Sequence, residues 1–424
     1  MAATIEHNGR AYRRPDRPLA VVCIDGGDPA YFASGLKDGI IPNIARFMKE
    51  GFSTVADGTV PSFTCPNNMS IVTGRPASVH GISGNFYLDR KTGEAVVMTG
   101  PELLRADSIM AEFSRRGLRV ASITAKDKLR QQLGRNMELG KSGGRSGGSV
   151  SFSSQCADRC TMAENGIEDV LGFVGQPLPD MYSPELSLFV LDAGIKLLET
   201  RRPDLLYLSL TDFIQHAHAP GAPEANAFYA NLDRRFGRLV ELGATVALTA
   251  DHGMNDKSKP DGTPNVIWLQ DVLDKEFGPD RSTVICPITD AFVGHHGALG
   301  GFVRVYCRNG LTPRDVTGLV AGLPGVEAAY ERAETARRFE LPEDREGDVA
   351  VISDAGACIG ARRVDHDLSG LKGHRLRTHG GLSEAKVPIV ISAPVTDAYA
   401  RRAEQRPLKS YDVFDYALNG TATA

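Results

Sequence analysis

The chain is 424 residues long, which is enough for two or three ordinary domains or for one large core with an insertion. Its 42% hydrophobic and 24% charged residues are typical of a soluble globular protein and exclude a disordered, collagen-like or coiled-coil chain. The net charge of −4 and the single Trp argue against nucleic acid as the main partner, but they are compatible with a small anionic substrate.

The N-terminus lacks a basic segment followed by an apolar one, and no apolar run approaches the roughly 18 residues that a membrane span needs. The seven cysteines include no zinc-knuckle spacing, and Cys156 and Cys160 have no second pair. This pattern favours free thiols in a reducing compartment. We therefore expect a cytoplasmic protein with no membrane partner.

Short apolar runs alternate with helical patterns along the chain. A helix is predicted to begin at Ser183-Pro184, with Ser183 as its N-cap, and another begins at Pro223 and ends before Gly243. Such alternation predicts an α/β fold, with a largely parallel central sheet and helices on both faces. Buried strands are predicted for residues 19–24, 118–124, 205–210, 245–250 and 387–391.

Two segments depart from this alternation. The Gly- and Ser-rich stretch 140–155 is expected to be a flexible surface loop, with an anion-binding loop as the alternative. Residues 264–370 predict a smaller α+β cap, inserted into a core formed by residues 1–263 and 371–424. Within the cap we expect helices over 266–277 and 313–323, and strands over 283–288, 301–307, 326–330 and 348–352.

Acidic and histidine side chains follow several of the predicted core strands. Because the carboxyl ends of parallel strands meet at one edge of a sheet, we expect these side chains to converge. Asp212 and His216 would share one face of a helical turn. A single Asp in such a place is more often a helix cap, but several uncompensated carboxylates at one edge would repel each other. The six candidates are Asp25, Asp212, His216, Asp251, His252 and His379.

Oxygen and imidazole nitrogen ligands of this kind suit zinc. Six of them suffice for two ions that keep open positions for a substrate, and two neighbouring ions can clamp a displacement at phosphorus. Thr64 stands before Pro66 and a helical run, where a helix N-terminus would favour an alkoxide or a phosphate; a simple capping role is the alternative.

Lys126 and Lys128 follow the strand predicted at 118–124. Two residues apart in an extended segment, they would both face the cleft, where they would suit a second anionic group of the substrate. The alternative is a pair of solvated surface lysines.

Together these motifs resemble the nucleotide pyrophosphatase/phosphodiesterase branch of the alkaline phosphatase superfamily. The resemblance covers the whole core, and the run Thr124-Ala125-Lys126-Asp127-Lys128 is similar to one in the phosphonoacetate hydrolases of that branch, which are zinc enzymes that cleave a carbon–phosphorus bond. The matching segments are Asp25-Gly26, Phe63-Thr64-Cys65-Pro66-Asn67, Ile71-Val72-Thr73-Gly74, His80-Gly81-Ile82, Asp212 with His216, Asp251-His252-Gly253-Met254 and His379-Gly380.

The resemblance implies two zinc ions per subunit. One would be held by Asp212, His216 and His379. The other would be held by Asp25, Asp251 and His252, with Thr64 bound to it as the nucleophile. The substrate would be phosphonoacetate, cleaved through a phosphothreonine into acetate and phosphate, in a protein that we expect to be a homodimer. The implied substrate-binding residues are Asn85 for a phosphoryl oxygen, Lys126 and Lys128 for the carboxylate, and His218 near the site.

The same residues bear on three other functions. A phosphodiesterase or nucleotide pyrophosphatase would use the same metals but would need an aromatic slot for a base. A sulfatase is disfavoured because Cys65 directly precedes Pro66 and no Arg follows. A non-catalytic metal-binding protein would lack a ligand or the nucleophile, and none is missing. The remaining histidines, His80, His295, His296, His366 and His374, are expected to be structural or exposed.

Overall fold

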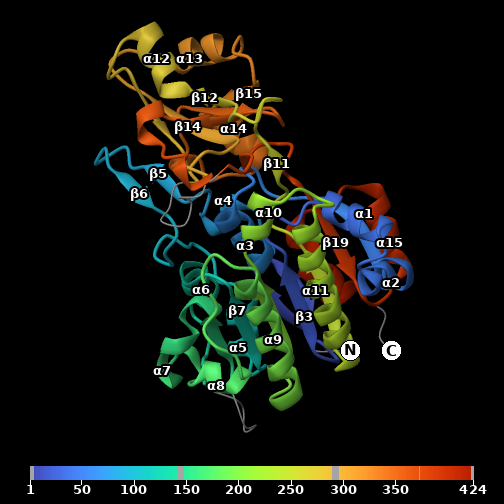
Figure 1. Cartoon of the computed structure of the whole chain (residues 1–424). Coiled ribbons are helices and arrows are strands. Elements are labelled where there is room, and N and C mark those ends of the chain that lie inside the picture. Colours follow the sequence, from blue (N-terminus) through green and yellow to red (C-terminus); the bar gives the residue numbers. More distant parts are fainter. Residues whose placement is uncertain (1–3, 141–147, 289–295, 372, 422–424) are drawn as a thin grey trace.

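A seven-stranded sheet forms the centre of the chain. The computed structural model describes residues 4–140, 148–288, 296–371 and 373–421 (Figure 1). The strand order is β4-β19-β10-β3-β9-β7-β8, and every neighbouring pair from β10 to β8 is parallel. Only β19 runs against the others, because it pairs antiparallel with both β10 and β4. The strands are β3 (Leu19–Cys23), β4 (Phe52–Asp57), β7 (Val120–Thr124), β8 (Val150–Ser153), β9 (Leu205–Ser209), β10 (Thr245–Thr249) and β19 (Lys386–Ile391).

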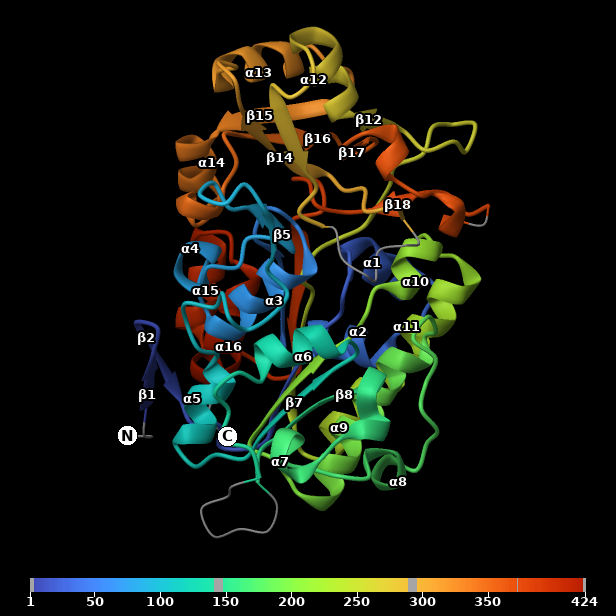
Figure 2. The same ribbon diagram turned by 90° about the vertical axis from the view of Figure 1, so that its left-hand side faces the viewer.

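Helices cover both faces of this sheet, and each face has its own apolar core (Figure 2). In β3, Ala20 and Val22 point into one core and Val21 and Cys23 into the other, as the period-two alternation of a strand requires. The predicted α/β fold is therefore confirmed. One face carries α1 (Pro29–Lys37), α2 (Pro42–Glu50), α9 (Glu185–Thr200) and α11 (Pro223–Glu241); the other carries α3 (Thr64–Thr73), α5 (Ile109–Arg115), α6 (Asp127–Leu133), α15 (Asp397–Gln405) and α16 (Val413–Asp415).

The start of α9 differs from its prediction by one position. Pro184, not Ser183, is the N-cap, and no side chain caps this helix. The Ser183 hydroxyl instead donates to the carbonyl oxygen of Asp180, at 2.9 Å. A short polar side chain can bond to several nearby backbone groups, so its sequence position alone does not fix which one it uses.

The stretch 140–155 is only partly a loop. Residues 141–147 lie outside the described residues, but Val150–Ser153 form the fully buried edge strand β8, paired with β7. The loop was predicted here because Ser151 and Ser153 have small polar side chains, which are typical of loops. In the fold they are buried, and Ser153 donates a hydrogen bond to Asp127.

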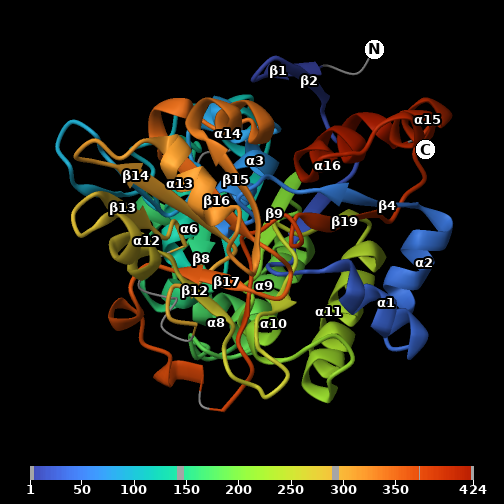
Figure 3. The ribbon, with the colours of Figure 1, turned by 90° about the horizontal axis from the view of Figure 1, so that it is seen from above.

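A second sheet lies above the first and forms the predicted α+β cap (Figures 1 and 3). It is antiparallel, in the order β13-β14-β16-β15. The stretch predicted as one helix, 266–277, begins with a strand instead, because Val266–Trp268 pair with Cys358–Gly360 as β12 and β17. The boundaries of the cap at 263 and 371 remain predictions. Its elements are β13 (Ser282–Ile285), β14 (Phe302–Cys307), β15 (Val326–Glu331), β16 (Val349–Ser353), α12 (Leu269–Phe277), α13 (Pro313–Val320) and α14 (Arg332–Phe339).

Two further observations concern the expectations drawn from composition. All seven cysteines are free thiols. Within the described ranges, no helix combines the length and the apolar character that crossing a bilayer would require.

Candidate active site

The candidate ligands converge at the carboxyl edge of the parallel strands, as expected. Asp25 follows β3, Asp251 and His252 follow β10, and Asp212 follows β9 as the N-cap of α10 (Phe213–Ala217). His379 arrives from the other direction, directly after the short strand β18 (Arg377–Thr378). All of these side chains are buried.

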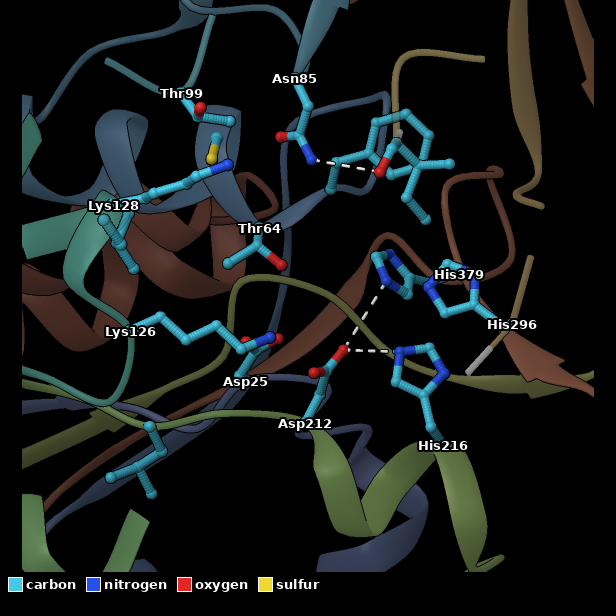
Figure 4. A pocket seen from close by; sticks show the side chains of 15 residues that line it. Asp25, Thr64, Asn85, Thr99, Lys126, Lys128, Asp212, His216, His296 and His379 are labelled. Atoms are coloured by element: carbon cyan, nitrogen blue, oxygen red, sulfur yellow. Dashed lines mark hydrogen bonds and ion pairs between the residues drawn. The ribbon is translucent and has the colours of Figure 1, made fainter. Parts of the chain in front are cut away.

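The ligand atoms form two adjacent groups. In one, Oδ2 of Asp212 lies 2.8 Å from Nε2 of His216 and 3.8 Å from Nε2 of His379 (Figure 4). In the other, Nε2 of His252 lies 3.3 Å from Oδ1 of Asp25 and 3.8 Å from Oδ2 of Asp251. The rings of His252 and His379 stack with their centroids 3.5 Å apart, which joins the two groups.

The division of ligands between two ions is less simple than predicted. Ligand atoms of Asp212, His252 and His379 lie within 4.8 Å of one another, as do those of Asp25, Asp251 and His252. His252 therefore lies between the groups. The assignment of His216 to the first ion, and of His252 to the second alone, remains a prediction.

The three histidines are oriented by backbone carbonyls. A carbonyl oxygen can only accept, so each Nδ1 carries the proton, and a neutral ring then directs the lone pair of Nε2 into the site. This is the tautomer that coordination of a metal through Nε2 needs. The Nδ1 atoms of His216, His252 and His379 lie 2.7, 2.9 and 2.7 Å from the carbonyl oxygens of Arg377, Gly253 and Ser62, respectively.

Burial and neighbouring charges shift the pKa values of the candidate ligands. Burial and the neighbouring carboxylates of Asp212 and Asp251 raise the pKa of Asp25 well above its usual value. Burial opposes the charged form of His252, but Asp251 and Asp25 raise its pKa to about 10. Burial likewise opposes ionisation of Asp212, but His216, Lys126 and His379 hold its pKa well below the usual range.

These residues fit zinc. Two ligands that each lie about 2.1 Å from one tetrahedral ion are roughly 3.4 Å apart. The nitrogen–oxygen distances of 2.8, 3.3, 3.8 and 3.8 Å within the two groups scatter around that value. A positive charge between each carboxylate oxygen and the facing imidazole nitrogen makes these contacts favourable, and either a metal ion or a proton on the ring can supply it. The donor set, its spacing and its tautomers therefore point to a metal centre.

Thr64 lies beside this centre as the first residue of α3. Its Oγ1 is 3.3 Å from Nε2 of His252. Phe63 is the N-cap of α3 and no side chain caps it, so Thr64 does not use its hydroxyl as a cap. Its side chain lines the pocket in front of the metal ligands.

Behind Thr64 lies a hydrogen-bonded network that the sequence did not indicate. Asn68, one turn further along α3, donates to the carbonyl oxygen of Thr64 and to Oδ2 of Asp251, both at 3.1 Å. Its own Oδ1 accepts from Tyr207 at 2.7 Å and from Ser209 at 3.1 Å. This network fixes the Asp251 carboxylate relative to the nucleophile helix.

The pocket continues from the metal ligands to Asn85, Lys126 and Lys128 (Figure 4). Lys126 is the N-cap of α6 and Lys128 lies in its first turn, so the junction of β7 and α6 brings both into the lining. Asn85 donates from its side chain to the carbonyl oxygen of Ile288 in the cap, at 3.2 Å. The predicted nucleophile and these three predicted substrate ligands therefore share one pocket.

Two polar residues of the pocket were not singled out by the sequence. Thr99 contributes a buried hydroxyl, and His296 comes from the cap and is 2% exposed. The His296 ring stacks on that of His216, with centroids 4.7 Å apart. His296 is therefore buried and lines the pocket, which the expectation of a structural or exposed histidine did not include. His295 lies outside the described residues. Neither residue stands in a motif whose spacing could have indicated it.

His218 is not brought into this lining. Its Nδ1 lies 3.4 Å from Oε2 of Glu224, and its ring packs edge-on against His374, with centroids 6.0 Å apart. A direct contact of His218 with substrate remains a prediction that this geometry does not favour.

The chain matches known proteins over its full length. The family model for type I phosphodiesterase / nucleotide pyrophosphatase matches residues 19–381. Crystal structures of phosphonoacetate hydrolase from Sinorhizobium meliloti 1021, in complex with phosphonoformate and with phosphonoacetate, superpose with a TM-score of 0.93. The sequence identity is 42%, and the match covers 100% of both chains.

One more distant solved structure shares the fold, and one more distant relative matches in sequence. Human ectonucleotide pyrophosphatase / phosphodiesterase 5 gives a TM-score of 0.62 at 17% identity, over 96% of each chain. An uncharacterized pyrophosphatase/phosphodiesterase of Schizosaccharomyces pombe is 23% identical over 263 residues. That match spans 60% of this chain and 47% of the yeast protein, so the chain covers about half the length of this relative.

Proposed function

Because the chain belongs to the type I phosphodiesterase / nucleotide pyrophosphatase family, and because two lysines line its pocket beside a buried metal site, we propose that it hydrolyses the carbon–phosphorus bond of phosphonoacetate. The chain is a hydrolase of the alkaline phosphatase superfamily. The lysine pair carries the choice of substrate, since it offers positive charge for a carboxylate beyond the phosphoryl group.

Two zinc ions would be held by the six Asp and His side chains described above. When bound, they supply Lewis-acid stabilisation of the phosphoryl oxygens and lower the pKa of a coordinated hydroxyl. The Nδ1–carbonyl bonds of the three histidines hold the rings in the orientation that this binding needs.

Thr64 is the proposed nucleophile. Its Oγ1 loses its proton to solvent, which later returns one to the leaving carbon, and attacks phosphorus in line with the carbon that leaves. A phosphorus–oxygen bond to Thr64 forms, the phosphorus–carbon bond breaks, and its electron pair moves onto the methylene carbon. Water then attacks the phosphothreonine, which releases phosphate and restores the Thr64 hydroxyl.

Lys126 and Lys128 would stabilise the negative charge of the carbon leaving group. The electron pair on the methylene carbon can spread into the adjacent carboxylate as an enolate-like dianion. Ammonium groups that already face this carboxylate stabilise the charge as it develops and require little rearrangement. Protonation of the carbon then gives acetate.

Asn85 would donate an N–H to a phosphoryl oxygen. It lines the same pocket as Thr64, and its amide nitrogen, which already donates to Ile288, is a donor of the kind that such an oxygen accepts from. The charge on the phosphoryl oxygens grows during attack, so a fixed donor stabilises the transition state more than the ground state.

The first experiment is phosphate release from phosphonoacetate by the zinc-loaded protein. An aryl phosphodiester serves as the second substrate, because the family model also favours a phosphodiesterase, and a chelator-treated sample is the control. Chelator-sensitive release that clearly exceeds diester turnover supports the proposal. Turnover of the diester alone would reassign the pocket to phosphodiesters and leave the lysines without a substrate role.

We also predict that the enzyme acts in the cytoplasm as a homodimer. Light scattering on the purified protein measures the oligomeric state, and cell fractionation measures the location. A monomer, or recovery outside the cytoplasmic fraction, would contradict this part of the proposal.

A further inference from the structure

One buried arginine of the cap makes contacts that reach the active-site pocket. Arg304, in the middle of β14, is 0% exposed, and its partner Glu346 is 1% exposed. Nε and Nη2 of Arg304 bond to the two carboxylate oxygens of Glu346, at 2.8 and 2.7 Å. A buried ion pair of this kind costs desolvation energy and contributes little net stability. Stability therefore does not explain why Arg304 is here, and the positions of its other donors suggest a role.

The remaining donors of Arg304 leave the cap and reach a core segment. Nη1 donates to the carbonyl oxygen of Phe86 at 2.9 Å. Nη2 donates to the carbonyl oxygen of Ser83 at 2.8 Å and to its hydroxyl at 3.0 Å. Ser83 and Phe86 flank Asn85 on both sides, so the guanidinium brackets the turn that carries Asn85.

The packing at Gly84 shows how closely this turn is held. A Cβ atom at Gly84 would lie 2.8 Å from Cβ of Pro287 and 3.1 Å from Nη1 of Arg304. No side chain larger than hydrogen fits there unless the cap moves. The turn is therefore in direct contact with the guanidinium group.

The same cap sheet also holds Asn85 itself. The backbone N–H of Asn85 donates to the carbonyl oxygen of Pro287 at 2.6 Å, and its side chain donates to that of Ile288 at 3.2 Å. Pro287 and Ile288 follow β13, in which Ile285 pairs with Arg304 of β14. One pair of neighbouring cap strands thus holds the turn at its flanks, its backbone and its amide.

We propose that Arg304 is a positioning residue, which fixes the Asn85 amide over the phosphoryl group and makes transition-state stabilisation depend on the cap. This rests on the role proposed above for Asn85. An arginine is needed because its planar fork can serve the Glu346 carboxylate and two carbonyl oxygens at once. A lysine would neutralise Glu346 from a single nitrogen but could not span all of these acceptors.

The test is a double-mutant cycle on kcat/KM for phosphonoacetate. Asn85→Ala removes one donor to the developing oxyanion and should cost about 100-fold. Arg304→Lys should cost roughly 10-fold or more. In the Arg304→Lys background, the further cost of Asn85→Ala should fall from about 100-fold to about 10-fold or less, because the amide is already displaced.

Arg90→Lys is the matched control. Arg90 also joins core to cap, through its ion pair with Asp348 at 3.0 Å and a hydrogen bond to the backbone carbonyl oxygen of Glu346 at 3.3 Å; among the described residues, neither contact reaches the Ser83–Phe86 turn. It should leave kcat/KM within about twofold and should not couple to Asn85→Ala. Zinc content and thermal midpoint are measured for every variant. In Arg304→Lys the zinc content should match the wild type, whereas the midpoint should fall because buried carbonyl oxygens lose their donor.

Should Arg304→Lys not fold, the neutral pair Arg304→Met with Glu346→Met replaces it, because removing both charges avoids a buried unpaired carboxylate. The same criteria then apply. Costs of Arg304→Lys and Asn85→Ala that multiply without coupling would overturn the proposal, as would an Arg304→Lys enzyme with full activity. If the wild type hydrolyses only the aryl phosphodiester, the proposed substrate is wrong, and the same cycle on that diester still decides the role of Arg304.

Discussion

At the scale of single residues, Thr64 offers the most direct test of the chemistry. Thr64→Ala removes the attacking oxygen and should lower kcat by at least about 1,000-fold, while Asp25, Asp251 and His252 remain to bind metal. Phosphate release and zinc content are measured on the same sample. Thr64→Ser keeps a hydroxyl and is the control, which should retain much of the activity. An alanine variant with normal turnover would show that another group attacks phosphorus.

The lysine pair makes a prediction about specificity. Lys126→Ala and Lys128→Ala should each lower kcat/KM for phosphonoacetate by about 100-fold, because each removes a charge that faces the carboxylate. An aryl phosphate ester lacks that carboxylate and should lose less than about threefold. Lys37→Ala, at the exposed end of α1, should change neither rate. Equal losses on both substrates would contradict the carboxylate role.

The positions of site residues could be predicted where those residues stand at or just after the end of a strand. Asp25 and Asp251 stand at strand ends, so the parallel topology alone brought them together. Asn68 and His296 could not be found in this way. Asn68 lies in the middle of the buried helix α3, where nothing in the sequence distinguishes it from the residues that only pack. His296 reaches His216 only because the cap docks on the core.

At the scale of elements, one buried ion pair joins the loops that carry two metal ligands. Glu384 accepts from Lys257 at 2.9 Å and from the backbone N–H of Gly381 at 2.9 Å. Its own carbonyl oxygen accepts from the N–H of Gly253 at 2.7 Å. Gly253 directly follows the ligand His252, and Gly381 lies two residues after His379. The pair therefore couples the loop after β10 to the loop before β19.

Glu384→Ala should destabilise the fold by about 3–5 kcal/mol, because Lys257 would remain buried without a counter-charge. It should also weaken zinc binding, since both ligand loops lose a shared anchor. Urea unfolding and zinc competition with a chromophoric chelator measure the two effects. The control is Lys386→Ala on β19, which removes the ion pair of an exposed lysine with Asp57 of β4 and should cost no more than about 1 kcal/mol. Equal costs in the two variants would contradict this reading of the pair.

The types of most elements followed from their patterns, but their limits did not. The strands at 19–24 and 205–210 and the helix from Pro223 were predicted almost to the residue, because burial on both faces and clear end signals define them locally. The segment at 266–268 was predicted as helix. It became a strand because Cys358–Gly360, far along the chain, pair with it, and such long-range pairing leaves no local signature.

At the scale of the whole molecule, the site belongs to neither layer alone. The parallel sheet supplies the metal ligands, and the cap supplies the carbonyls and the guanidinium that hold Asn85. The α/β class and the presence of a cap could be predicted from composition and alternation. The strand order and the docking of the cap could not, because they depend on contacts between segments hundreds of residues apart.

This arrangement predicts that metal binding and folding are linked. Without cations, the carboxylates of Asp25, Asp212 and Asp251 share one buried site, and their repulsion opposes the native state. Ions that bind only the folded protein stabilise it by about 4 kcal/mol per site when the free ion concentration is 1,000 times the dissociation constant of that site. With an unfolding entropy of roughly 2 cal/mol/K per residue, that corresponds to a rise of about 5 °C in the thermal midpoint per site.

Chelation should therefore lower the midpoint by roughly 5–10 °C, and two equivalents of zinc per chain should restore it. Differential scanning calorimetry measures the shift, and Asp212→Asn, which weakens one group of ligands, should recover only part of it. Lys37→Ala should behave as the wild type. A midpoint that does not respond to the chelator, in a protein shown to have lost its zinc, would mean that the cluster of carboxylates is stable without cations and that metal serves the chemistry alone.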